Sequence, residues 1–401
     1  METLSKCLEV PTEPRSTAVI ATTIATTVAL MSLARFTLWP RKRTIIPSPL
    51  KTSLPKLSKD EVTALSYGTD TFPGARDVDT PYGSIRVYEF GPEDGRKVLF
   101  IHGISTSCMT LKDIAIPLSK NGCRVMLFDL FGRGFSDAPD DIPYDTRLFV
   151  TQILLVLASS QLPWTGENGL SVIGYSLGGG IAANFAATFP NMVGSLILLA
   201  PAGLIRPENF GRMTRLVFTS GVIPERILHA LTKRRLRQPI ASSVSKKVKK
   251  AVADASSNTP LKIGQKGDYV DVALQEAKDP IDEPAQTPFE LQVIKSVQWM
   301  VDCHEGFVTA FMSTIQYAPL MDQHEYWRQL AKRKSGTTAV LIGKNDSLVQ
   351  PDDYTEDALP LLGGKDNVFW RVVSGSHNFP FTHGPEALEH IYEFWDMKRN
   401  E

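Results

Sequence analysis

A serine between two glycines is the first feature of this sequence that could do chemistry. Ser176 lies at the centre of Gly174-Tyr-Ser-Leu-Gly178, between a short apolar run and a run of small residues that ends at Pro190. This order predicts a strand, a tight turn and a helix, which is the setting of a nucleophile elbow. Gly174 and Gly178 allow a close chain approach that a side chain would block. A serine hydroxyl is a weak nucleophile by itself, so Ser176 needs a base and a group that orients this base.

Alternating strands and helices surround this turn. Continuous apolar runs predict buried strands over 97–103, 123–130, 171–175, 193–203, 337–346 and 367–380, and two further strands lie within 75–90. Helical spacing predicts helices over 109–120, 146–162, 181–189 and 385–397. The pattern is typical of βαβ units, and we therefore expect an α/β fold with a mostly parallel sheet and helices on both faces.

The alternation stops after the sixth predicted strand and returns near residue 337. Between the sixth predicted strand and residue 337, helical patterns at 212–222 and 289–303 flank a polar stretch at 254–287. We therefore expect a helical cap that is inserted into the core. The predicted divisions are a tail (1–16), a membrane anchor (17–36), a linker (37–75), the first part of the core (76–204), the cap (205–336) and the second part of the core (337–401).

The amino-acid composition excludes several classes of partner and cofactor. Lys+Arg and Asp+Glu each number 43, so the formal net charge is zero and nothing in the balance suggests a nucleic-acid partner. The four cysteines are scattered, which favours neither a disulfide framework nor a zinc site. Motifs for metal or nucleotide binding are absent from the sequence, and we predict no cofactor and no metal.

The segment Thr17 to Ala34 contains no charge, glycine or proline. As a helix it would span about 27 Å, close to the thickness of the hydrocarbon core. A signal peptide or a mitochondrial presequence fits poorly, because acidic residues outnumber basic ones before the run. A membrane anchor is the preferred interpretation, and a weakly helical tail is the alternative.

Charges after this run predict the side of the membrane. Arg35, Arg41, Lys42 and Arg43 follow it, and by the positive-inside rule the large carboxyl-terminal part faces the cytosol. The sequence contains one N-x-[ST] triplet, at Asn345. A glycan there would obstruct the adjacent residue, which we nominate below as catalytic, so the triplet also favours the cytosolic side, where it would not be glycosylated.

Five stretches in order carry a family resemblance: FIHGIS, FDLFGRGFSD, GYSLGGG, GKNDSLVQP and GSHNFPF. Together they are far more specific than the elbow motif, which chance alone would place in about one such chain in ten. From about Arg76 to Met397 the chain resembles the α/β-hydrolase superfamily. It is similar to epoxide hydrolases and meta-cleavage-product hydrolases with a cap, but its elbow carries serine where epoxide hydrolases carry aspartate.

The resemblance implies partners for Ser176. His377, in the loop after the last strand, matches the base of the family, and Asp346 matches its acid. The order Ser, Asp, His is the one that this fold uses. His383 is an alternative base, and Asp352 and Asp353 are alternative acids, although we expect these carboxylates to be solvated.

The resemblance also implies an oxyanion hole made of two backbone N–H groups. One is that of Leu177, directly after the nucleophile, and the other is that of Ile104. His102 and Gly103 would shape this loop, with His102 structural, and Ser105 would support it. The turn from Asp129 to Asp137, which includes Arg133, is also expected to be structural.

Three functions are compatible with these residues. The preferred one is a membrane-anchored serine hydrolase of carboxylic esters, with lipid-like esters possible. The second is a thioester or C–C bond hydrolase of a metabolite, and the third is a hydrolase-like binding protein without turnover. The basic stretch Lys233 to Lys250 is either a solvated helix face or a contact for anionic lipid headgroups. Fold alone does not fix a substrate.

Overall fold

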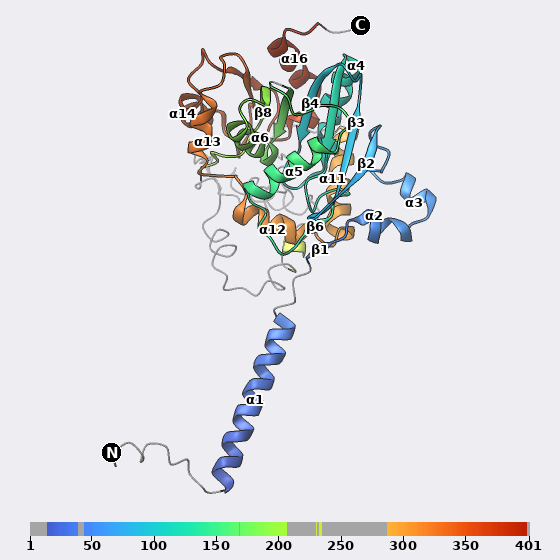
Figure 1. Cartoon of the computed structure of the whole chain (residues 1–401), viewed down its shortest axis with the longest axis vertical. Coiled ribbons are helices and arrows are strands. Elements are labelled where there is room, and N and C mark those ends of the chain that lie inside the picture. The colour runs from blue at the N-terminus through green and yellow to red at the C-terminus, as the bar shows by residue number, and fades with distance from the viewer. Residues whose placement is uncertain are drawn as a thin grey trace, which may run out of the picture.

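An eight-stranded sheet forms the centre of the molecule (Figure 1). The computed structural model describes residues 14–38, 44–167, 169–206, 230, 232–234 and 287–398. The strand order is β10-β9-β8-β7-β4-β5-β3-β2. These strands are β2 (Ala75–Thr80), β3 (Gly83–Phe90), β4 (Arg96–Ile101), β5 (Cys123–Phe128), β7 (Leu170–Tyr175), β8 (Val193–Leu199), β9 (Thr338–Gly343) and β10 (Phe369–Val373). All pairs from β10 to β5 are parallel, and only the pairs that β3 makes with β5 and with β2 are antiparallel, which confirms the predicted fold class.

Helices cover both faces of this sheet. In β4, Leu99 and Ile101 pack on the side of α5 (Thr146–Ala158), α6 (Leu177–Thr188) and α14 (Pro351–Leu361), whereas Val98 and Phe100 pack on the side of α4 (Lys112–Lys120) and α16 (Gly384–Trp395). All four side chains are fully buried. Burial on both faces explains why these strands are uninterrupted apolar runs in the sequence. Because the central strands are parallel, the loops that follow them meet at one edge, which we call the carboxyl edge.

Residues 44–75 are not a linker. They contain β1 (Ile45–Ile46), α2 (Pro49–Thr52), the 3₁₀ turn η1 (Leu54–Lys56) and α3 (Lys59–Thr63). The strand β1 pairs with β6 (Ala138–Pro139) in a separate two-stranded ladder. The linker prediction over 37–75 is therefore wrong for residues 44–75, because elements of two to five residues are too short to show a period.

One buried carboxylate fastens this region to the core. The Oδ1 atom of Asp137 accepts a hydrogen bond from the backbone N–H of Ser48 at 2.7 Å. Its Oδ2 atom accepts from the N–H of Ser84 on β3 at 2.8 Å and from Nζ of Lys51 at 2.7 Å. Further along, Tyr67 is buried against Phe135 and donates to Asp129. The amino-terminal region is thus part of the packed fold.

Helix α1 (Pro14–Leu38) is long and apolar enough to cross a membrane, as judged by length and composition. It extends beyond the predicted bounds of 17–36, and its side chains from Ala18 to Leu33 are exposed. Thr22, Thr23 and Thr26 donate their hydroxyls to carbonyls four residues earlier, each at 2.8 Å. These bonds satisfy three of the threonine hydroxyls in an otherwise mainly apolar segment.

Apart from residues 205–206, 230 and 232–234, the described part of the insertion begins at Thr287. It contains α11 (Pro288–Cys303), α12 (Phe307–Tyr317) and α13 (His324–Leu330). The predicted helix at 212–222, nearly all of the polar stretch at 254–287 and most of the basic stretch at 233–250 lie outside the described residues. These three helices all lie in the last part of the predicted cap, and the cap over 205–336 stays a prediction.

Helices α11 and α12 pack against the turn from Asp129 to Pro139. A Cβ atom on Gly306, between the two helices, would lie 2.4 Å from Cβ of Ala138, so the chains touch there. His304 Nε2 lies 2.9 Å from the carbonyl of Ser136, and the N–H of Gly306 donates to His304 Nδ1. Since Nδ1 accepts, His304 is neutral with its proton on Nε2, and burial lowers its pKa to about 4.

His304 makes the fold sensitive to acid. The unfolded chain binds a proton at His304 below its ordinary pKa of 6.5, whereas the folded chain binds it only near 4. Stability from this residue is therefore complete above pH 6.5 and falls as the pH drops to 4, by about 1.4 kcal/mol per pH unit. The variant His304→Gln keeps a donor for Ser136, and in detergent its unfolding free energy should fall less steeply over this window. An unchanged slope would contradict the assignment.

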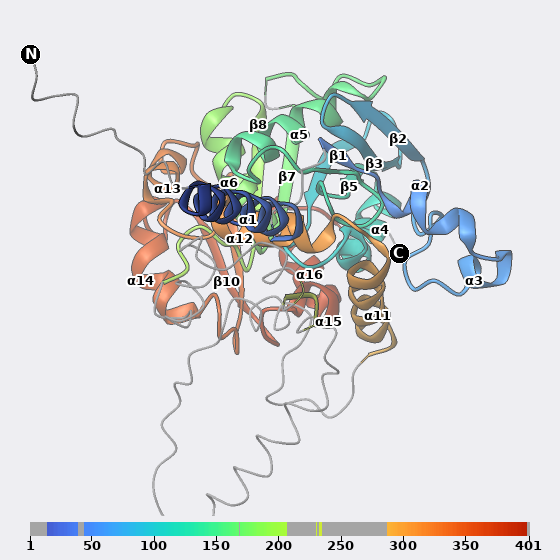
Figure 2. The same ribbon diagram turned by 90° about the horizontal axis from the view of Figure 1, so that it is seen from below.

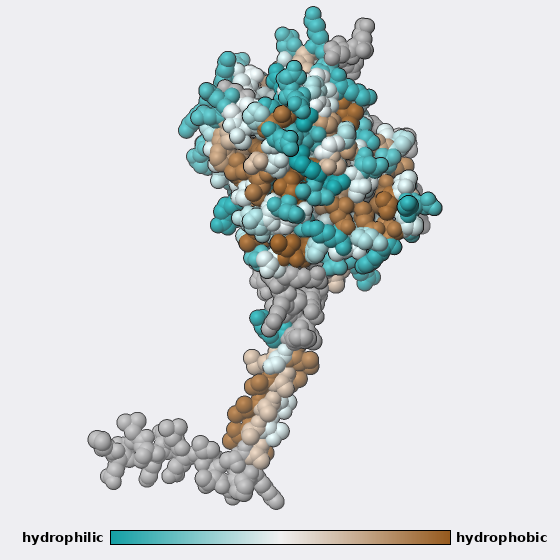
Figure 3. Space-filling model, turned by 45° about the vertical axis from the view of Figure 1, so that its right-hand side comes forward, coloured by the Kyte–Doolittle hydropathy of each residue, from teal (hydrophilic) through white to brown (hydrophobic). Residues whose placement is uncertain are grey.

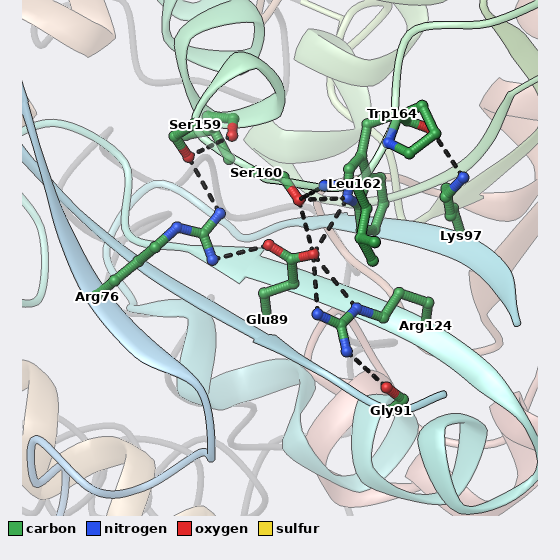
Figure 4. A network of polar contacts seen from close by, with 11 residues as sticks. Arg76, Glu89, Gly91, Lys97, Arg124, Ser159, Ser160, Leu162 and Trp164 are labelled. Carbon is green, nitrogen blue, oxygen red and sulfur yellow. Dashed lines mark hydrogen bonds and ion pairs between the residues drawn. The ribbon is translucent and has the colours of Figure 1, made fainter. Parts of the chain in front are cut away.

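Glu89 on β3 ties the outer strands to the end of α5 (Figure 4). Its carboxylate pairs with Arg76 at 2.8 Å and with Arg124 at 3.1 Å, and it accepts from the hydroxyl of Ser160 at 2.9 Å. Burial alone would raise the pKa of Glu89, but the bonds from Ser160 and Arg124 hold it below the ordinary value. The network fixes an edge of the sheet that lies away from the candidate site.

Candidate active site

Ser176 lies in the sharp turn between β7 and α6. Its φ of 54° and ψ of −119° are unusual for a residue with a side chain and cost of order 1–3 kcal/mol. Backbone bonds offset this strain: its N–H donates to Leu199 at 2.9 Å, and its carbonyl accepts from Gly179 at 2.9 Å and from Ala202 at 2.8 Å. The serine is thus held in one position by three backbone hydrogen bonds, from the start of α6 and from the end of β8 and the loop after it.

The two glycines that flank the turn have no room for a side chain. A Cβ atom on Gly174 would lie 2.3 Å from the carbonyl oxygen of Gly178. A Cβ atom on Gly178 would lie 2.1 Å from the carbonyl oxygen of Ile101 and 2.6 Å from that of His102. Gly178 therefore packs directly against the end of β4 and the loop that follows it.

We expect Gly178→Ala to destabilise the protein by about 3 kcal/mol, since backbone atoms must move to admit the methyl group. Alanine would normally favour a helix over glycine by about 1 kcal/mol, so the clash must exceed that gain. Gly166→Ala is the matched control, because a Cβ atom at Gly166 meets nothing within 4 Å. Chemical denaturation of both variants measures the difference, and equal stability would contradict the close approach.

Ser176, His377 and Asp346 form one chain of hydrogen bonds. His377 Nε2 lies 2.9 Å from the hydroxyl of Ser176, and His377 Nδ1 lies 2.8 Å from Oδ2 of Asp346. The three residues are buried, with exposed fractions of 4%, 1% and 3% in the order Ser176, His377, Asp346. An ionised carboxylate only accepts hydrogen bonds, so the proton of a neutral His377 belongs on Nδ1 and Nε2 can accept from the serine.

Two backbone N–H groups hold the carboxylate of Asp346 on the side away from His377. Its Oδ1 atom accepts from the backbone N–H of Leu348 at 2.9 Å and from that of Val349 at 2.8 Å. These two donors orient the carboxylate so that Oδ2 remains for His377. These two donors could not be predicted from the sequence, because every residue except proline carries a backbone N–H.

The alternative residues lie elsewhere. His383 ends the short helix α15 (Phe379–Thr382), and its Nδ1 lies 3.0 Å from the hydroxyl of Thr382. Asp352 and Asp353 lie in the first turn of α14, where Asp353 pairs with Arg206 at 2.9 Å. The hydrogen bonds at Ser176 therefore favour His377 and Asp346 over these alternatives.

Two backbone segments meet beside the serine hydroxyl. Leu177 is the first residue of α6, and the bonds to the carbonyl of Ser176 begin at Gly179, so the N–H of Leu177 is a helix-terminal donor. The loop after β4 carries Gly103, Ile104 and Ser105, with Ile104 5% exposed and Ser105 fully buried. The contact of Gly178 with His102 brings this loop to the start of α6.

His102 shapes this loop and is not placed to move protons. The N–H of Leu130 donates to Nε2 of His102 at 2.9 Å, so the imidazole proton is on Nδ1, which donates to the carbonyl of Gly103 at 2.9 Å. Burial lowers the pKa of His102 to about 3, which keeps the ring neutral. Both of its nitrogens are therefore used in structural bonds.

Arg133 connects two parts of the site region, and this connection could not be predicted from the sequence. It is fully buried, and its Nε donates to the carbonyl of Ile104 at 3.0 Å while another guanidinium nitrogen donates to the hydroxyl of Thr314 on α12 at 2.8 Å. The side chain thus joins the loop after β4 to the insertion. The partner Thr314 follows Arg133 by 181 residues, which is why no local pattern predicted it.

Comparison with known proteins supports the same assignment of fold. A family model described as the alpha/beta hydrolase fold matches residues 97–383. A "Serine hydrolase-like protein" from Danio rerio is 34% identical over 129 residues, which are 32% of this chain and 38% of the relative. A human protein of the same name is 35% identical over 120 residues, 30% of this chain and 56% of the relative. The matched region is thus about a third to just over half of these relatives.

Solved structures share the fold at low sequence identity. A bacterial membrane phospholipase A has a TM-score of 0.55 at 18% identity and covers 96% of this chain and 100% of its own. Naproxen esterase from Bacillus subtilis has the same TM-score and identity and covers 84% of this chain and 99% of its own. The family model extends from β4 through the loop of His377, and it includes the elbow and the insertion. This chain therefore belongs to the alpha/beta hydrolase fold family.

Proposed function

We propose that this chain is a membrane-anchored serine hydrolase that cleaves carboxylic esters, with lipid-like esters as the substrate class. The observation that carries the proposal is the buried chain of hydrogen bonds from Ser176 through His377 to Asp346. A serine hydroxyl bonded to an imidazole whose other nitrogen faces a carboxylate is the arrangement that activates serine for acyl transfer.

In the first step the Ser176 oxygen attacks the ester carbonyl while His377 Nε2 takes the hydroxyl proton. The imidazolium then gives this proton to the leaving alcohol, and the acyl group remains on Ser176. Water, deprotonated by the same nitrogen, releases the acid and restores the serine. Asp346 stays ionised and stabilises the imidazolium.

Negative charge develops on the carbonyl oxygen during both steps. The N–H groups of Leu177 and Ile104 are the proposed donors for this oxyanion, with His102, Gly103 and Ser105 supporting the loop. Burial of the site strengthens these interactions, because water does not compete for the donors.

The membrane part of the proposal rests on α1. Its apolar length and the internally bonded threonines suit a bilayer. The positive charges after it favour a position of the hydrolase on the cytosolic side. The structural likeness to a phospholipase concerns the fold alone, but it is a reason to include a phospholipid among the test substrates.

The test uses the full chain purified in a mild detergent. We expect a fluorophosphonate probe to label it and expect hydrolysis of acyl esters of increasing chain length and of a phospholipid. Thioesters and a vinylogous diketone are tested beside them. Faster cleavage of either would reassign the substrate class, and a folded protein that neither reacts with the probe nor cleaves any substrate would be a binding protein.

A further inference from the structure

The segment that follows α1 is fixed to the carboxyl edge of the sheet. Residues 44–53, which we call the N-terminal strap, begin with Thr44, whose carbonyl accepts from Asp140 at 3.1 Å. Ile45 and Ile46 then pair with Pro139 and Ala138. These partners continue the turn that follows β5, and this turn touches the site loop, since Arg133 donates to Ile104 at 3.0 Å. The strap therefore lies on the same edge as Ser176.

The strap also contacts the insertion. The hydroxyl of Ser53 donates to the carbonyl of Cys303 at the end of α11 at 2.8 Å. A Cβ atom on Gly306 would lie 3.4 Å from Ile46, so the junction between α11 and α12 packs against β1. The strap thus spans from the site edge of the core to the helices that cover it.

A short chain connects this strap to α1. Leu38 and Thr44 are separated by six peptide links, which span at most roughly 20 Å. A folded body of about 320 residues has a radius of gyration of about 20 Å and is therefore roughly 50 Å across. The chain cannot reach around such a body, so the end of α1 must lie near the carboxyl edge. Figures 1 and 2 show this end of α1 beneath α12 and near β1 and β6.

We propose that the N-terminal strap turns the carboxyl edge of the hydrolase toward the bilayer, so that substrate enters from the lipid surface. The proposal rests on the anchoring by α1 given under the proposed function. The strap is held to the core by the buried carboxylate of Asp137 and by the pairing of β1 with β6.

The distribution of exposed apolar side chains agrees with this orientation. Beyond α1, the large exposed hydrophobic residues of the described chain are Leu291, Tyr317 and Val372. Leu291 lies near the start of α11 and Tyr317 at the end of α12, and the strap contacts the junction between these two helices. In Figure 3 the surface of α1 is largely apolar, whereas the folded body is mixed, with apolar patches on several parts of this face, one of them at the end nearest α1.

Energy transfer to labelled lipid headgroups tests the orientation. The full chain is placed in phosphatidylcholine vesicles, with a donor dye on Glu305→Cys or Asp94→Cys after Cys7 and Cys303 are replaced by serine. Glu305 is exposed beside Gly306, and Asp94 is exposed before β4, at the opposite edge of the sheet. We expect stronger transfer from position 305 than from position 94. Equal transfer, or stronger transfer from position 94, would overturn the proposal.

A longer connection gives a matched control that leaves the fold and the site unchanged. Twelve Gly/Ser residues inserted between Arg43 and Thr44 add roughly 20 Å of flexible chain. The insertion should remove most of the excess transfer at position 305 and should slow hydrolysis of an ester embedded in the vesicles, but not of a water-soluble ester. Unchanged transfer would overturn the proposal. Failure of the wild type to float with vesicles would reject the anchoring and this proposal, while hydrolysis of the soluble ester would still stand.

Discussion

Replacing Ser176 with alanine is expected to lower kcat on the best ester by about 10⁵- to 10⁶-fold. The variant loses the atom that attacks the carbonyl, and His377 then has no hydroxyl to deprotonate. The remaining activity would come from binding and from the oxyanion donors alone. Steady-state rates and fluorophosphonate labelling of the same preparations measure the effect, and labelling should disappear.

Ser171→Ala is the matched control for this change. Ser171 is buried on the same strand, β7, but lies before the elbow. It should keep both labelling and turnover near the wild-type level. If Ser176→Ala instead retained activity within tenfold of the wild type, the nucleophile would lie elsewhere and the proposed mechanism would be wrong.

Asp346→Asn is expected to lower kcat by about 10⁴-fold while the fold stays intact. The two backbone donors at Leu348 and Val349 would hold the asparagine oxygen, so its NH₂ group would face His377 Nδ1. That group donates, and the imidazole proton must then move to Nε2. The histidine would donate to Ser176 and could no longer accept its proton.

Asp353→Asn separates this effect from a general loss of charge. Asp353 is one of the two alternative acids from the sequence, and in the structure it pairs with the half-buried Arg206. Its replacement should leave kcat within about twofold, since such pairs contribute at most about 1 kcal/mol to stability. Equal losses in the two variants would show that the orienting carboxylate is misassigned.

The sheet could be predicted from the sequence because its central strands are buried on both faces. Uninterrupted apolar runs mark β4, β5, β7, β8 and β9, and each begins or ends within a few residues of its predicted bounds. Helix α14 was not predicted, because its acidic first turn and Pro360 near its end hide the apolar face formed by Tyr354 and Ala358. The elements of residues 44–63 were missed because they are held by contacts with residues far along the chain, above all Asp137.

The candidate site could be predicted only in part, because its geometry also depends on contacts between residues far apart in the sequence. Ser176, Asp346 and His377 could be nominated because each follows a recognisable strand within a quoted motif. Their distances depend on the neighbour relations of β7, β8, β9 and β10, which no local pattern encodes. The tie from Arg133 to Thr314 and the N–H donors to Asp346 likewise arise only when distant segments meet.

The backbone conformation of the elbow limits the side chains that position 176 can accept. At φ 54° a β-branched residue is strongly disfavoured, whereas short unbranched side chains are tolerated. Threonine, although it has a hydroxyl, is therefore excluded as a replacement for Ser176, while cysteine or aspartate would fit without rebuilding the turn. The dihedral angle of one residue therefore limits the nucleophiles that this position can carry to those with a short, unbranched side chain.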